Sequence, residues 1–158
     1  MQFPQTVIAL FSLLLLAACA DSSPPDEQAP AAPYEVVTDN HHTMELILDP
    51  AADVVWSSAG YVIYDRGETA LHPTTDEGWH AVEAAAAMIT EGANLLLMPG
   101  RSMGPDWNEY SVGLREAGKL AMAAALAQDP EALFDAGGRI YQVCRACHNQ
   151  YWVKQEDN

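Results

Sequence analysis

Basic side chains are scarce in this chain. Its 158 residues include 7 Lys and Arg against 22 Asp and Glu, which gives a formal net charge of −15. Binding to nucleic acid depends on Lys and Arg that neutralise phosphates, so the composition argues against a nucleic-acid partner. The same charge predicts protein partners with basic docking surfaces. The length allows one domain of ordinary size and a leader, and the apolar fraction of 49% is that of a globular chain.

Charge of either sign is absent from the first twenty residues, since Asp21 is the first charged residue. An apolar run from Val7 to Leu16 is too short to span a membrane and predicts an export signal. Leu16-Ala17-Ala18-Cys19 looks like a bacterial lipoprotein cleavage box. It predicts a signal peptide over residues 1–18 and a lipid on Cys19, which would anchor the protein to the membrane on its periplasmic side. The alternative is an ordinary cleaved signal that ends near a cysteine, because no Lys or Arg precedes the apolar run.

The segment that follows lacks large apolar side chains as far as about Pro33 and is rich in Pro, Ser, Ala and acidic residues. Such a composition is typical of disordered tethers. We therefore predict a lipid anchor and linker over residues 19–39 and a folded domain over residues 40–158.

Sustained β-branched alternation is also missing, so no strand is predicted and the fold class is expected to be all-α. Four stretches instead place apolar residues three and four apart, which is the spacing of one helix face. They run from Met44 to Val62, from Trp79 to Leu96, from Trp107 to Ala124 and from Leu133 to Tyr151. Four such helices with short connections predict an antiparallel four-helix bundle.

Local signals agree with three of these helix starts. Thr75 or Thr74 is a candidate N-cap for the second helix, Gly104-Pro105 opens the third and Asp129-Pro130 opens the fourth. Pro50 lies inside the first stretch, where it removes a backbone donor. The first helix is therefore expected to kink or to begin at Pro50.

Cysteine occurs only three times, at Cys19, Cys144 and Cys147, and Cys144-Arg145-Ala146-Cys147-His148 matches the attachment signature for c-type haem. Positions i, i+3 and i+4 share one helix face, so two thiols and an imidazole project toward the same object. The thiols would form thioethers with one haem, and His148 would bind its iron as the proximal ligand. Because Cys19 belongs to the leader, this assignment leaves no cysteine for a disulfide.

Two other kinds of site use the same residue types. A thioredoxin-type redox pair needs a strand–helix–strand context, which the sequence does not predict. Zinc would need further ligands, such as His41, His42, His72 or His80.

An exported four-helix sequence with its haem motif in the last helix resembles the cytochrome c prime superfamily, over roughly residues 40–154. The resemblance implies a haem-bearing bundle, a homodimer in many relatives, and a distal residue from the start of the first helix. The matching position is Met44, whose sulfur would raise the reduction potential relative to a second imidazole. Met44 as a plain core residue is the alternative, and His41 or His42 could compete for the iron.

The family includes both six-coordinate electron carriers and five-coordinate gas binders. The first hypothesis is that this chain is of the first kind, a periplasmic electron carrier with one haem c and no catalytic residues. A protein that binds nitric oxide or carbon monoxide at an open or displaceable distal site is the second hypothesis, and a lipoprotein that never receives haem is the third.

Overall fold

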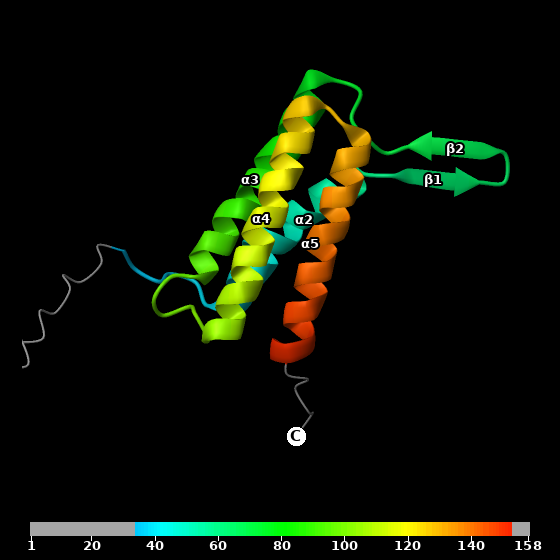
Figure 1. The fold of residues 1–158 in the computed structure, drawn as a ribbon. Helices are drawn as coiled ribbons and strands as arrows, with labels where there is room; N and C mark the ends of the chain where they lie inside the picture. Colours follow the sequence, from blue (N-terminus) through cyan, green and yellow to red (C-terminus); the bar gives the residue numbers. More distant parts are fainter. Residues whose placement is uncertain (1–33, 153–158) are drawn as a thin grey trace, which may run out of the picture. The chain divides into compact units, whose positions relative to one another are not determined.

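Helices make up most of the chain over residues 34–152, which are the residues that the computed structural model describes (Figure 1). The elements are α1 (Asn40–Thr43), the π-helix η1 (Met44–Leu48), α2 (Asp49–Ser57), α3 (Asp76–Leu96), α4 (Pro105–Ala127) and α5 (Pro130–Tyr151). The last three coincide closely with the predicted second, third and fourth helices. The predicted signal peptide, Cys19 and the linker as far as residue 33 lie outside the described residues.

The helix caps form as the sequence predicts. The Thr75 side chain accepts a hydrogen bond from the Gly78 backbone at 3.1 Å and caps α3. Asp129 caps α5 by accepting from the backbone of Glu131 and Ala132, both at 3.0 Å. Each cap satisfies donors that a helix N-terminus leaves free. The caps therefore fix where α3 and α5 begin.

The N-terminal helical segment changes type at Pro50. Pro50 lies in the first turn of α2, and the Asp49 N–H bonds back five residues to the Met44 carbonyl rather than four. An α-helical register would bring the proline ring against the carbonyl of Leu46, and the wider π turn relieves this clash. The prediction that a helix kinks or begins at Pro50 is confirmed in this form.

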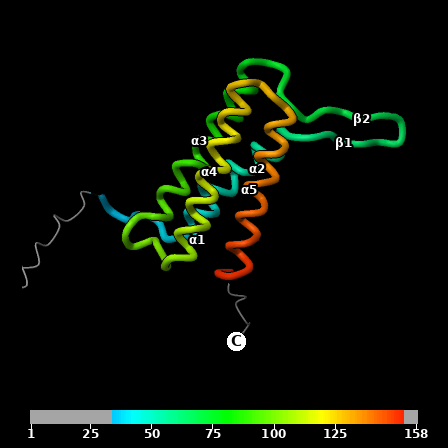
Figure 2. Tube along the Cα trace, in the orientation of Figure 1, coloured from blue at the N-terminus to red at the C-terminus, as the bar shows by residue number. Residues whose placement is uncertain are grey.

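A β-hairpin replaces the end of the predicted first helix, so the expectation of no strand is wrong. Strand β1 (Tyr61–Tyr64) pairs antiparallel with β2 (Gly67–Ala70), with Val62 opposite Thr69. The helix ends at Ser57, and Gly60, at φ +84°, leads the chain into Tyr61-Val62-Ile63-Tyr64, which is a favourable strand sequence. The hairpin extends away from the helices, and all of its strand residues are exposed (Figures 1 and 2).

The core lies between α2, α3, α4 and α5 and is rich in alanine. Its fully buried larger side chains are Val55, Val82, Ile89, Leu133 and Ile140. Small residues let the helices approach closely: a Cβ at Gly92 would lie 2.6 Å from Leu48 Cδ2, and one at Gly118 would lie 2.5 Å from Thr90 Oγ1.

Candidate functional site

The C-terminal half of α5 carries the three motif residues. Cys144, Cys147 and His148 are half-buried, whereas Arg145 and Ala146 between them are exposed. The spacing i, i+3, i+4 thus turns two thiols and an imidazole toward the protein on one helix face. Both thiols pack against the core, and neither forms a disulfide.

Burial controls the chemistry of both thiols. Burial above all, with the nearby charges of Cys147 and Asp49, raises the pKa of Cys144 from 9.0 to about 11. Burial also raises the pKa of Cys147. Since the thiolate is the reactive form, both cysteines are protonated and weakly reactive at neutral pH.

Aromatic and amide side chains join the end of α5 to the start of α4. The Tyr151 ring meets the Trp107 ring edge to face, with centroids 5.2 Å apart. Gln150 accepts a hydrogen bond from the Tyr110 hydroxyl at 3.0 Å and donates one to Asp106 at 2.9 Å. These contacts fix the helix end that carries the motif.

His148 and Trp152 form a separate pair. Their rings meet edge to face with centroids 5.0 Å apart, and Trp152 is 69% exposed. The imidazole is therefore at the edge of the protein, partly accessible, with an aromatic ring beside it.

Contacts between α2 and α5 define an antiparallel register. The Trp56 indole donates to the Gly137 carbonyl at 3.0 Å, and the charge of Asp49 acts on Cys144. Asp49 precedes Trp56 by seven residues, about two turns, along α2, and Cys144 follows Gly137 by the same number along α5. Met44 is half-buried and packs against the same core as the two thiols.

His41 and His42 lie on the exposed side of α1. His42 Nδ1 is 2.9 Å from an Asp39 carboxylate oxygen, and His41 Nδ1 is 3.9 Å from that of Glu45. Each ring thus has one nitrogen near a carboxylate on its own turn and both side chains are exposed, whereas Met44 is half-buried and packs against the core. Of the three candidate distal ligands, Met44 alone contacts the core.

Arg101 is a buried residue that the sequence analysis did not single out. It lies in the α3–α4 connection, is 6% exposed, and donates from Nη1 to Thr43 Oγ1 and from Nη2 to Thr38 Oγ1, the latter at 3.1 Å. None of the ion pairs among residues 34–152 includes it. Sequence alone offers no signal for it, because an arginine in a polar loop is normally exposed.

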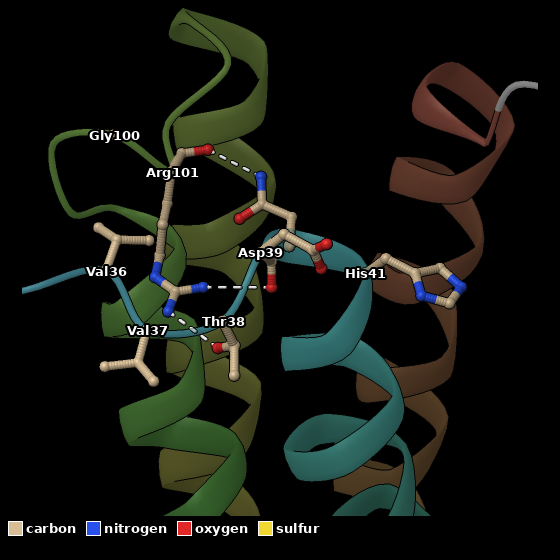
Figure 3. A pocket seen from close by; sticks show the side chains of 8 residues that line it. Val36, Val37, Thr38, Asp39, His41, Gly100 and Arg101 are labelled. Carbon is tan, nitrogen blue, oxygen red and sulfur yellow. Dashed lines mark hydrogen bonds between the residues drawn. The ribbon is translucent and has the colours of Figure 1, made fainter.

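A cavity of about 530 Å³ lies beside this arginine and is lined by Val36, Val37, Thr38, Asp39, Asn40, His41, Gly100 and Arg101. Figure 3 shows Arg101 reaching toward Thr38 and Asp39, while His41 points away from it. The motif residues of α5 do not line this cavity.

The residues of α5 fit a c-type haem by the chemistry of their donor set. Covalent attachment needs two free thiols and one imidazole on a shared helix face, and Cys144, Cys147 and His148 meet this requirement. No three His, Cys, Asp or Glu side chains of the described chain come together as a metal-binding group. A haem site has no need of one, because the porphyrin supplies the remaining iron ligands.

Comparison of the chain with models of known families, with curated proteins and with solved structures finds no match. Between residues 34 and 152, no helix combines the length and the apolar character needed to cross a membrane.

Proposed function

We propose that this chain is a single-haem c-type cytochrome that carries electrons between other proteins in the bacterial periplasm. Its fold would be an antiparallel four-helix bundle, in which α1, η1 and α2 together supply the first helix and α5 holds the cofactor. When bound, haem c supplies one-electron Fe(III)/Fe(II) chemistry. No residue of the chain needs to act as a catalyst for this function.

One observation carries the proposal: Cys144, Cys147 and His148 turn inward together from α5 while the residues between them face solvent. The two thiols would each add across a vinyl group, with sulfur bonding to carbon and the proton passing to the neighbouring carbon. His148 would give the iron a ring nitrogen. This division between the two sides of the helix is what attachment along one haem edge requires.

Met44 is proposed as the distal ligand. It is half-buried and contacts the same core as the thiols. A thioether sulfur favours ferrous iron, so Met44 would hold the reduction potential above that of a bis-imidazole site.

The predicted lipid on Cys19 would tether the domain through the linker over residues 19–39. The charge of −15 favours redox partners with basic docking surfaces. Both features suit a carrier that meets several partners near a membrane.

The test is expression of the full chain in a bacterium with a cytochrome c maturation system, followed by haem staining of denatured protein and an absorption spectrum. Covalent haem with a low-spin ferric spectrum and a methionine-to-iron charge-transfer band is the expected result. A Cys144→Ser, Cys147→Ser double variant is the control, and it should remain unstained.

Two other outcomes of this experiment would contradict the electron-carrier proposal. Covalent haem with a high-spin ferric spectrum supports the gas-binding hypothesis, because an open distal site admits nitric oxide or carbon monoxide. A colourless product from cells that mature another c-type cytochrome normally would overturn both.

A further inference from the structure

We propose that Arg101 is a positioning residue. It holds the start of η1 so that the Met44 sulfur faces the iron. It also places beside that ligand a positive charge that no ion pair of the described residues neutralises. The inference rests on the proposed haem function. Arg101 belongs to the α3–α4 connection, 57 residues from Met44 along the chain, so its role follows from the folded structure alone.

The hydrogen bonds of Arg101 converge on the turn before Met44. Its guanidinium donates to Thr43 Oγ1, to Thr38 Oγ1 at 3.1 Å and to the Asp39 carbonyl at 3.4 Å. In return, the Asn40 side-chain amide donates to the Arg101 carbonyl at 2.9 Å. The planar guanidinium thus bonds several points of the chain at once, which a flexible ammonium cannot reproduce.

Thr43 is the link between Arg101 and the ligand. It is fully buried, and its hydroxyl also bonds to the Asp39 carbonyl at 2.8 Å and lies 3.0 Å from Thr38 Oγ1. Met44, the next residue, begins the π-helical segment. A shift of Thr43 therefore moves Met44 directly, because the two residues are neighbours in one continuous helical run and both have α-helical φ and ψ.

The charge of Arg101 is not neutralised by any ion pair among the described residues. All of its hydrogen-bond acceptors are neutral oxygens. A buried cation acts through a medium of low effective dielectric constant and favours the more reduced state of a nearby redox centre. Arg101 would therefore raise the reduction potential in two ways, by fixing the sulfur ligand and by its field.

The closing experiment compares Arg101→Met, Arg101→Lys and Thr43→Val with the wild type, all as matured full-length protein. Arg66→Met is the matched control, because Arg66 is exposed in the hairpin and its loss changes the net charge equally. The readouts are the strength of the methionine-to-iron band, the ferric spin state and the reduction potential. Amide hydrogen exchange over residues 43–48 is measured in parallel on the haem-free chain.

Arg101→Met should lower the potential, weaken the methionine band and speed exchange over residues 43–48 about tenfold. Arg101→Lys should keep more of the potential but lose part of the band, and Thr43→Val should loosen the segment while leaving the charge. Arg66→Met should match the wild type. Wild-type band, potential and exchange in Arg101→Met would overturn the inference alone, whereas a wild type without haem would overturn the proposed function itself.

Discussion

The Trp56 indole N–H donates a hydrogen bond to the backbone carbonyl of Gly137 at 3.0 Å. The ring also lies against the Gly137 Cα, where an added Cβ would be 3.4 Å from Trp56 Cδ1. Trp56 of α2 thus packs against Gly137, which is buried, whereas the next glycine of α5, Gly138, is exposed. This contact lies two turns from Asp49 along α2 and two turns from Cys144 along α5, so it ties the helix that follows η1 to the helix that carries the motif.

Replacing Trp56 with Phe keeps most of the ring and removes the hydrogen bond. We expect the free energy of unfolding to fall by about 1–2 kcal/mol, since one partly buried hydrogen bond is lost and a small void remains. Urea unfolding followed by circular dichroism measures the change. Trp152→Phe is the control, because Trp152 is exposed, and an equal loss in both variants would contradict the assignment.

Close approach of α3 and α4 at Gly118 gives a second prediction. A Cβ there would lie 2.5 Å from Thr90 Oγ1 and 3.1 Å from the Thr90 backbone nitrogen, so the two helices would have to separate. Gly118→Ala should destabilise the protein by roughly 1–3 kcal/mol despite the higher helix propensity of alanine.

Gly138 is the matched control for Gly118. It lies in the interior of α5, and a Cβ there meets nothing within 4 Å. Gly138→Ala should therefore stabilise the protein by about 0.5–1 kcal/mol through helix propensity alone. Thermal unfolding of the two variants should move in opposite directions, and two shifts of the same sign would show that the helix spacing at Gly118 is wrong.

The helices were predictable from sequence because each signal is local. Thr75 and Asp129 act within one turn of their own helix starts, and apolar spacing marks the buried face over each whole helix. The hairpin was missed because Val62 continues the apolar period of the preceding residues, although α2 has already ended at Ser57. Arg101 could not be predicted either, since its partners Thr38 and Thr43 come from a distant part of the chain.

The motif on α5 was readable for the same reason as the caps, since Cys144, Cys147 and His148 lie within five residues. The role proposed for Met44 could not be predicted from local spacing in the same way. It depends on where the folded chain places Met44, in the π-helical segment just before Pro50, and the residues around Met44 do not encode that position. The sequence therefore predicts which residues of α5 share a helix face, but not what surrounds them.

The raised pKa of Cys144 makes the stability of the haem-free chain depend on pH. The folded state holds the thiol pKa at about 11 against 9.0 for the unfolded chain, so the folded state disfavours the thiolate. The contribution of this thiol to the free energy of unfolding is fully present below pH 9. It is lost as the pH rises to 11, because the unfolded chain releases its thiol proton first. The loss amounts to roughly 2–3 kcal/mol.

Urea unfolding at intervals between pH 8 and pH 11 measures that slope, with Cys144→Ser as the reference that lacks it. Asp49→Asn should reduce the slope slightly, since the charge of Asp49 contributes to the shift. Identical slopes in the wild type and Cys144→Ser would show that the thiol is not held in a buried site.

Met44 provides the sharpest test of the distal assignment. In the matured protein, Met44→Ala should change the ferric iron from low spin to high spin, abolish the methionine-to-iron band and lower the reduction potential, because the soft sulfur ligand is lost. Met98→Ala is the control, since Met98 is also half-buried but lies in the α3–α4 connection. Unchanged spectra in Met44→Ala would exclude Met44 as a ligand.

A low-spin spectrum of Met44→Ala without the methionine band would instead indicate that His41 or His42 has bound the iron, which requires α1 to turn about its axis. Since His42 is bonded to Asp39 on the same turn, Met44→Ala combined with Asp39→Asn should increase any such histidine-bound fraction.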